Sequence, residues 1–268
     1  MQFPQLVLSD ELLCFWNEIR LFGIKPGNME RAQKLFSFYR IHAINEEQYK
    51  RSQVPLEPSF KAALMMSPLK ELLLFKGTIE DLSLMTRLKI ILCENKCSFP
   101  YVNINSQDET LESNFTGTFD NVPRDKCVKH LTALCKDAKS ILICDKYLYV
   151  SKDGSLDDCR QHSLKRVTNI MQVIDPSTSC KVDFIDFYYD NNPRKNEFNN
   201  SPFKWVIDQL KQSYPSVDRR RYNGSKSDVH DRYMLIESNQ GKVKVLFSSG
   251  FENLFDDTKD MTYIVRCL

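Results

Sequence analysis

The sequence predicts an α/β protein in which a helical N-terminal region precedes a mixed β-sheet domain flanked by helices. Three observations lead to this fold class. Apolar residues recur at helical spacing over much of the first 92 residues. From residue 140 onward, short apolar or alternating runs typical of strands take turns with amphipathic helical stretches. The chain is 42% hydrophobic, which is enough for a sizeable core. We therefore expect a mainly helical region over residues 1–124 and an α/β domain over residues 125–268.

Helical signals dominate the N-terminal region. Ser9 is a preferred N-cap residue, and apolar side chains follow it at helical spacing until Gly23. The aromatic side chains of the first two helices are expected in the core, namely Phe15, Trp16, Phe36 and Tyr39. The further elements expected here are a second helix from Asn28, a segment over Ser59 to Leu74 divided by Pro68, a helix over Thr78 to Leu92, and a strand at Tyr101-Val-Asn-Ile.

The C-terminal domain is predicted to run strand, helix, strand, helix and then three strands. The run Ser140-Ile-Leu-Ile-Cys-Asp145 is short and apolar, as in a strand buried on both faces. The segment Lys181 to Tyr188 alternates between polar and apolar residues and predicts a second strand. Ser238-Asn-Gln-Gly241 predicts a hairpin turn. The expected helices are 124–138, 156–174 and 201–214, and the expected strands are 140–145, 181–188, 229–237, 242–248 and 262–267.

Composition limits the classes of function. The net charge is +2, so any attraction for a polyanion must be local. Nine cysteines at irregular spacing, several of them in apolar runs, predict reduced thiols in a cytoplasmic protein. The N-terminus lacks the pattern of a signal peptide, and no apolar stretch is long enough to predict a membrane span. We expect no cofactor and no metal. Zinc is a minor alternative, because its candidate ligands lack the usual paired spacing: Cys93, Cys97, Cys127 and His130.

One short motif carries most of the chemical information. His230, Arg232 and Glu237 follow the order histidine, one residue, cation, four residues, acid. On a strand, side chains two residues apart share a face, so His230 and Arg232 are expected to point the same way. Glu237, at an odd offset, lies where the hairpin begins. A guanidinium holds phosphate oxygens in a fork, and an imidazole can attack phosphorus or transfer a proton. The pair therefore predicts a phosphate site.

This motif resembles the His-x-Lys-x4-Asp motif of the phospholipase D superfamily, with Arg232 in place of lysine and Glu237 in place of aspartate. The resemblance covers roughly residues 138–268. In the family, the motif strand is followed by a turn, another strand and a Ser/Asn segment that binds phosphate. The matching residues here are Ser248, Ser249 and Asn253, with the asparagine register shifted. The strand ending in Asp145 is similar to the opening strand of divergent members with a single His-Asp-Arg motif. Asp260, or alternatively Glu252, matches a downstream acid.

The resemblance implies a metal-independent phosphodiesterase, most simply a nuclease, with His230 as the nucleophile. It implies that Arg232, Ser248, Ser249 and Asn253 bind or orient the phosphate, and that Glu237 supports the catalytic group. Family enzymes use two such motifs in each active site, whereas His42, His130 and His162 lack the pattern. A homodimer is therefore expected for catalysis. By analogy with other single-motif proteins, a role in prokaryotic defence is a further hypothesis.

A basic run precedes the motif. Two interpretations of Asp218-Arg-Arg-Arg-Tyr-Asn-Gly-Ser-Lys226 have equal weight: a solvated loop, or contacts with DNA or RNA through Arg219, Arg220, Arg221 and Lys226, with Tyr222 stacking on a base. Catalysis itself stays open, because some His-Asp-Arg relatives resemble membrane-binding modules. The alternative is a non-catalytic module that binds phosphate groups of nucleic acid or of a phosphoinositide membrane. The N-terminal region would recognise an unknown protein partner or regulate access.

Overall fold

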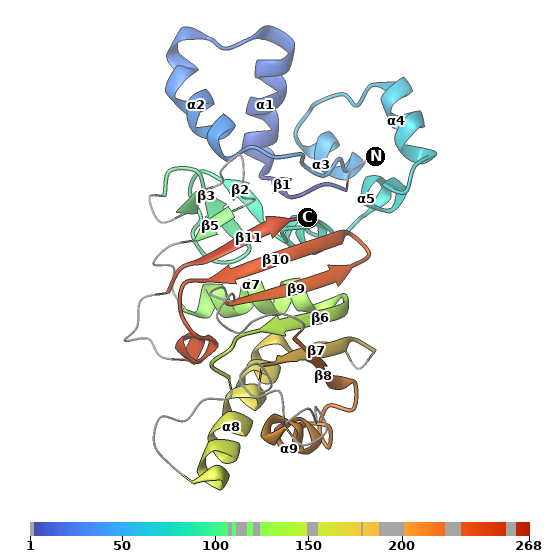
Figure 1. The fold of residues 1–268 in the computed structure, drawn as a ribbon. Coiled ribbons are helices and arrows are strands. Elements are labelled where there is room, and N and C mark those ends of the chain that lie inside the picture. Colours follow the sequence, from blue (N-terminus) through green and yellow to red (C-terminus); the bar gives the residue numbers. More distant parts are fainter. Residues whose placement is uncertain are drawn as a thin grey trace. The chain divides into compact units, whose positions relative to one another are not determined.

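The computed structural model describes residues 3–106, 109–110, 117–119, 124–148, 155–177, 179–187, 201–222, 232–255 and 261–268. It has a mixed α/β fold, as the sequence predicts (Figure 1). The chain divides into two compact units, residues 1–122 with Cys267 and residues 123–266 with Leu268. This division falls two residues before the boundary expected from the sequence. No helix in the described ranges is long and apolar enough to cross a membrane.

Short helices make up most of the first unit. Ser9 caps the first of them by accepting a hydrogen bond from the backbone N–H of Leu12 at 3.3 Å. Thr78 and Asp81 form a capping box at the start of the last. The helices are α1 (Asp10–Phe22), α2 (Met29–Phe38), α3 (Glu46–Arg51), α4 (Pro58–Met65), α5 (Lys70–Leu74) and α6 (Ile79–Leu84), with a 3-10 turn at Pro26–Asn28 between the first two.

A three-stranded parallel sheet lies at the centre of the first unit. Its order is β1 (Val7–Leu8), β2 (Ile91–Cys93) and β3 (Tyr101–Asn103). The chain around His42 runs parallel beside β1 through a bridge to Leu6. Apolar side chains of the strands and of the neighbouring helices form the core: Val7, Ala43, Leu72, Leu82, Ile91, Cys93 and Tyr101. A short antiparallel pair, β4 (Glu109–Thr110) and β5 (Gly117–Phe119), follows in the chain.

The second unit is built on a mixed sheet with the strand order β11-β10-β9-β6-β7-β8. β6, β7 and β8 are parallel, whereas β9 is antiparallel to both β6 and β10. The carboxyl ends of β6, β7, β8 and β10 therefore meet at the edge where β9 begins. The strands are β6 (Ala138–Cys144), β7 (Lys181–Asp186), β8 (Val217–Arg221), β9 (Arg232–Ser238), β10 (Gly241–Phe247) and β11 (Tyr263–Cys267).

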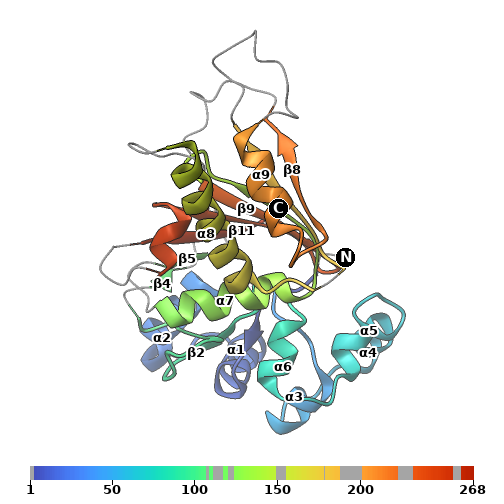
Figure 2. The same ribbon diagram turned by 90° about the horizontal axis from the view of Figure 1, so that it is seen from below.

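Three helices, α7 (Arg124–Lys136), α8 (Leu156–Ile174) and α9 (Pro202–Leu210), pack side by side as one layer against this sheet (Figure 2). Ser201 caps α9 with Pro202 at the first position, as the sequence predicts. Side chains that alternate along the central strands fill the space below the helices, namely Ile141, Ile143, Phe184, Met234 and Ile236. A second buried cluster, Cys144, Ile185 and Phe187, is packed against Tyr222 and Tyr233. The central strands are thus buried on both faces.

Two secondary-structure predictions are wrong. The helix expected over Thr78 to Leu92 ends at Leu84, and its last residues form β2, because they pair with β1 and β3 in the core. The basic run, taken in one interpretation as a loop, begins as strand β8. β7 is buried along nearly its whole length, including Asp183 and Asp186, so its polar and apolar alternation does not mark a solvent face.

Candidate functional site

Arg232 begins β9 and meets a buried carboxylate at the end of β6. Its Nε lies 3.6 Å from Oδ1 of Asp145, whose side chain is fully buried. Asp145 is fixed by the backbone N–H of Tyr147, which donates to Oδ1 at 2.8 Å. The Tyr147 ring lies under the Arg232 guanidinium, with 4.8 Å between the guanidinium carbon and the ring centroid. Two anchors, one ionic and one aromatic, therefore position this guanidinium.

The strand register explains why Arg232 and Asp145 meet. Cys144 pairs with Tyr233, so the next step along the register brings Asp145 opposite Arg232. The register of β6 and β7 has a similar effect. Ile143 pairs with Phe184, so Asp145 and Asp186, each two residues further along its strand, lie opposite each other. Each carboxylate has its own arginine, because Asp186 accepts from Nη1 of Arg219 at 2.9 Å. The edge therefore carries two adjacent carboxylates, Asp145 and Asp186, each paired with an arginine.

Three further cations make this edge electropositive. Lys146 Nζ lies 5.3 Å from the centroid of the Tyr147 ring. Arg166, from α8, donates to the backbone carbonyl of Tyr147 at 2.8 Å. Arg221, at the end of β8, is exposed and has no ion pair among the described residues. Five cations therefore face two carboxylates among the described residues of this edge, which favours an anionic ligand.

Two donors at this edge are buried and lack a hydrogen bond among the described residues, although one of them, Arg232 Nε, forms the 3.6 Å ion pair with Asp145. Arg232 Nε makes no hydrogen bond within the described residues, and neither does the hydroxyl of Ser249. Phe247, two residues before Ser249, pairs with Arg232, so the chain beyond β10 continues at the same edge. Buried donors in folded proteins nearly always have partners. A ligand that accepts hydrogen bonds would supply them here.

The other residues expected to bind phosphate have different placements. Ser248 is exposed, and its hydroxyl accepts from the backbone N–H of Thr262 at 2.9 Å. Because its backbone N–H also donates to the Thr262 carbonyl, Ser248 joins two chain segments structurally. Asn253 lies in a 3-10 helix (Phe251–Phe255), and its side chain has no hydrogen bond within the described ranges.

Glu237 lies apart from Arg232, although the sequence motif groups the two residues. It lies five residues from Arg232 on the same strand, which corresponds to about 17 Å, and the odd spacing places it on the opposite face. It faces Lys242 across the hairpin, with 3.2 Å between Oε2 and Nζ. Glu237 therefore does not contact the guanidinium of Arg232 on its own strand.

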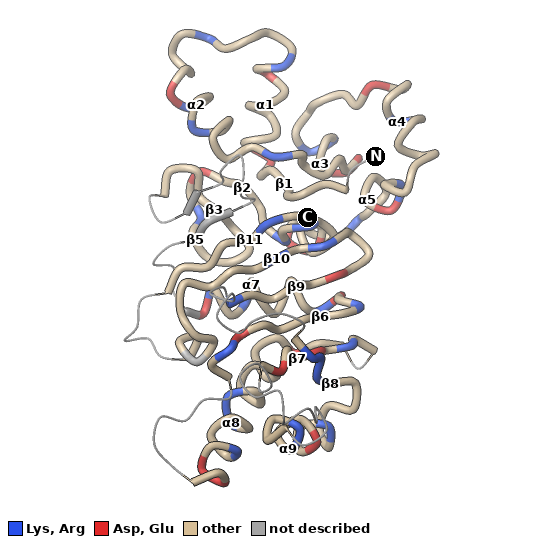
Figure 3. The backbone as a smooth tube through the Cα atoms, viewed as in Figure 1, with Lys and Arg blue, Asp and Glu red and all other residues tan. Residues whose placement is uncertain are grey.

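The basic run divides into paired and unpaired arginines, and its location on β8 is visible in Figure 3. The side chain of Arg219 contacts Asp186 and is only 6% exposed, so it cannot reach a polyanion outside the protein. Arg220 donates to Asp183 at 2.8 Å from the other face of the strand. Tyr222 packs against Phe187, with 4.9 Å between ring centroids. Of the three arginines, Arg221 is exposed and has no ion pair among the described residues, and the side chain of Arg220 is 58% exposed beside Asp183.

Several expected site residues lie outside the described residues: His230, Asp260 and Lys226, together with the side chain of Glu252. The three remaining histidines of the chain are described. His42 belongs to the first unit, and His162 is exposed on α8. His130 is buried on α7 and hydrogen-bonded through Nδ1 to the Tyr263 hydroxyl at 2.9 Å. His162 lies four residues before Arg166, which contacts Tyr147 of the site.

A different group of residues gathers in the first unit without a clear sequence signal. Of the four aromatic residues expected in its core, Phe15 is buried, but Phe36 is 46% exposed. Trp16 and Tyr39 instead line a pocket together with His42. Helical spacing indicates which residues share a face, but not whether that face meets a core or a cavity.

All nine cysteines are free thiols, and no group of three or more potential metal ligands occurs within the described ranges.

Comparison with known proteins adds no assignment, since no family model matches the chain and no curated protein is significantly similar to it in sequence. The assignment of the candidate site therefore rests on its geometry.

Proposed function

We propose that the second unit binds a phosphate group of a phosphodiester at the carboxyl edge of β6 and β7. The observation that carries this proposal is a pair of buried donors that lack a hydrogen bond among the described residues, Arg232 Nε and the Ser249 hydroxyl, in an edge with excess positive charge. Phosphate oxygens accept hydrogen bonds from guanidinium and hydroxyl groups. In open sheets that contain parallel strands, this edge is also the usual place for a ligand.

The reaction we propose is metal-independent hydrolysis of the phosphodiester, as in the phospholipase D superfamily. A nitrogen of His230 attacks phosphorus and forms a phospho-histidine, and the leaving oxygen takes a proton from a second acid. Water then cleaves the P–N bond and restores the histidine. Because His42, His130 and His162 lack the motif pattern, the second acid in this proposal is His230 of the partner subunit in a homodimer. Asn253 remains a candidate for orienting the phosphate. Nine free thiols agree with a cytoplasmic setting.

Purified protein should cleave single-stranded DNA or RNA in the presence of EDTA. His230→Ala should lower the rate at least about a thousandfold, because it removes the nucleophile. Arg232→Gln should lower it strongly by removing the phosphate contact. The phospho-histidine should be trapped as an acid-labile label on the wild-type chain. Cleavage by His230→Ala at the wild-type rate would contradict the proposed mechanism.

Two matched variants serve as controls. Lys242→Gln removes one positive charge from the same sheet, at an exposed pair distant from Arg232. Glu237→Gln removes the acid that the sequence motif includes but that lies apart from Arg232. Both variants should keep the wild-type rate. Loss of activity in Glu237→Gln would restore the motif interpretation and contradict the placement of the site.

Binding without catalysis is the second candidate, favoured by the single motif histidine that each chain contributes. In that case, oligonucleotide affinity should fall steeply with salt concentration while no product forms. Arg232→Gln and Arg221→Gln should each reduce the slope of log affinity against log salt by about one, whereas Lys242→Gln should leave the slope unchanged. Vesicles containing a phosphoinositide provide the comparison. Preferential binding to them would assign the site to a membrane headgroup.

A further inference from the structure

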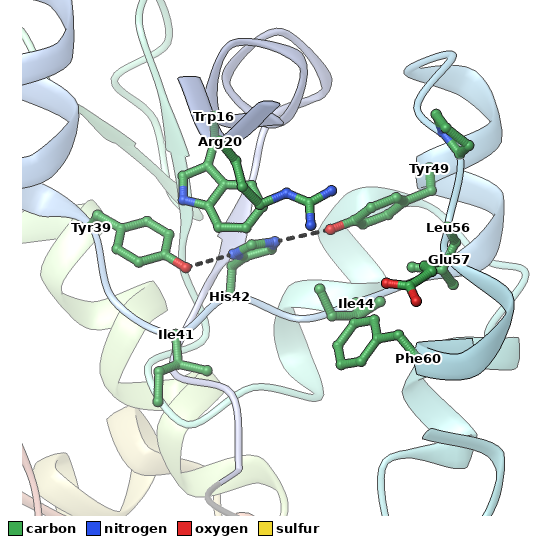
Figure 4. A pocket seen from close by; sticks show the side chains of 11 residues that line it. Trp16, Arg20, Tyr39, Ile41, His42, Ile44, Tyr49, Leu56, Glu57 and Phe60 are labelled. Carbon is green, nitrogen blue, oxygen red and sulfur yellow. Dashed lines mark hydrogen bonds between the residues drawn. The ribbon is translucent and has the colours of Figure 1, made fainter. Parts of the chain in front are cut away.

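A pocket of about 380 Å³ lies wholly within the first unit (Figure 4). Trp16 and Arg20, one turn apart on α1, form one wall. The segment between α2 and α3 contributes Tyr39 and His42, and α3 contributes Tyr49. Glu57, which precedes α4, and Phe60, in its first turn, close the other side. Pockets that bind small molecules usually have volumes of about 300–1,000 Å³.

His42 lines this pocket, and neighbouring residues fix both its backbone and its ring. Its backbone is fixed by the bridge to Leu6, and the N–H of Ala43 donates to the Leu6 carbonyl at 2.8 Å. Its ring meets Trp16 edge-on, with 4.8 Å between centroids. Its two nitrogens lie 3.2 Å from the Tyr39 hydroxyl and 3.4 Å from the Tyr49 hydroxyl, the second contact being long for a hydrogen bond. Burial, with a smaller effect of Arg20, lowers the pKa of His42 to about 4.

The neutral imidazole of His42 accepts the proton of only one of the two tyrosine hydroxyls that contact it. A neutral ring has one N–H and one acceptor nitrogen, so one tyrosine hydroxyl donates to it and the other accepts from it. The accepting hydroxyl then keeps its own proton for another partner. The Tyr49 hydroxyl also contacts the Asn17 side chain, so this donor is open to a ligand where Tyr39 is the accepting hydroxyl.

The charges of the lining also favour a particular ligand. Arg20 is exposed and has no ion pair or hydrogen bond within the described ranges; its guanidinium carbon lies 5.6 Å from the centroid of the Trp16 ring. Glu57 accepts from the Ser59 hydroxyl through one carboxylate oxygen at 2.5 Å, which leaves the other available to a donor. A cation in the aromatic pocket would be repelled by Arg20, which already covers Trp16. An anion would supply the partner that Arg20 lacks.

We propose that this pocket binds a planar aromatic ligand that carries a negative charge, of the nucleoside monophosphate class. The base packs against the aromatic walls formed by Trp16 and Phe60. The phosphate accepts from Arg20, and Glu57 accepts from a hydroxyl or amino group of the nucleoside. The pocket belongs to the first unit and its occupancy does not depend on the phosphodiesterase proposed for the second.

Trp16 makes a direct test feasible. The chain has two tryptophans, so Trp205→Phe leaves Trp16 as the single reporter. In this background, AMP should quench Trp16 fluorescence saturably. Adenosine and ribose 5-phosphate should each bind at least about tenfold more weakly, because each lacks one half of the recognised group. Arg20→Gln should weaken AMP binding by about tenfold or more. Equilibrium dialysis with labelled AMP provides a second readout.

Lys34→Gln is the matched control. Lys34 is an exposed cation on α2 outside the pocket, paired with Glu30, so its loss changes net charge equally. It should leave AMP affinity unchanged. Equal weakening by Lys34→Gln and Arg20→Gln would overturn the proposal, because it would indicate attraction to net charge alone. Saturable binding of tetramethylammonium without binding of AMP, CMP, GMP or UMP would overturn it as well, in favour of a cation-binding cage.

Discussion

Replacing Asp186 with alanine should lower the free energy of unfolding of the second unit by about 3–5 kcal/mol. The side chains of Asp186 and Arg219 are 1% and 6% exposed, with 2.9 Å between Oδ2 and Nη1. Removing the carboxylate leaves a buried guanidinium without its closest counter-charge, and water cannot replace it. Urea unfolding followed by Trp205 fluorescence, in a Trp16→Phe background, measures the second unit alone because Trp205 lies on α9.

Two controls show whether burial is the cause. Asp208→Ala breaks an exposed pair with Lys204 on α9 and should cost less than about 1 kcal/mol. The double variant Asp186→Leu with Arg219→Leu removes both charges and should recover much of the loss, since an apolar pair needs no counter-charge. A cost below about 1 kcal/mol for Asp186→Ala alone would mean that this ion pair is hydrated or replaced by another acid.

Acidification should destabilise the first unit through His42. Its folded pKa of about 4 lies below its ordinary value of 6.5, because burial disfavours the charged ring. The unfolded state therefore binds the proton more readily between these two pKa values, and stability is lost as the pH falls from about 6.5 toward 4. The linkage predicts a loss of about 2 kcal/mol between pH 7 and pH 5 from this residue. Trp16 fluorescence in the Trp205→Phe background measures it.

The contribution of His42 is separated from that of carboxylates by a matched variant. His42→Gln keeps an amide that can hydrogen-bond to the tyrosine hydroxyls but does not titrate. Its unfolding free energy should change less with pH than that of the parent chain, by about 2 kcal/mol over the same range. Tyr39 and Tyr49 face the ring, and both stay neutral between pH 5 and pH 7 because burial raises the pKa of each hydroxyl above its ordinary value of 10. Parallel curves for the two proteins would show that His42 binds protons equally in the folded and unfolded states.

Local features of the fold were predictable from the sequence. Ser9 and Ser201 cap helices because their hydroxyls reach backbone N–H groups two or three residues away, within one turn of chain. The hairpin forms where predicted, with Ser238 paired to Gly241. The apolar run ending in Asp145 forms the central strand β6. These interactions depend on residues near in sequence, so the pattern of the chain contains the information.

The tertiary structure decided which charged residues act together. β8 was missed as a strand because its arginines are neutralised by Asp183 and Asp186, more than 30 residues earlier in the chain. The same holds for Arg232, whose carboxylate is Asp145 on a neighbouring strand and not the motif acid Glu237. A motif specifies spacing along the chain, whereas a charged side chain interacts with whichever opposite charge the fold brings close to it.

The sequence alone therefore determined the fold class, the helix caps, the hairpin and the candidate role of Arg232. Packing determined that Arg232 faces Asp145, that Glu237 lies at the other end and face of β9, and that Trp16, Tyr39 and His42 line a pocket. The physical reason is that secondary structure follows from short-range hydrogen bonds and side-chain periodicity. A site instead requires groups from distant segments, and their meeting depends on strand order and register, which the sheet fixes only when it assembles.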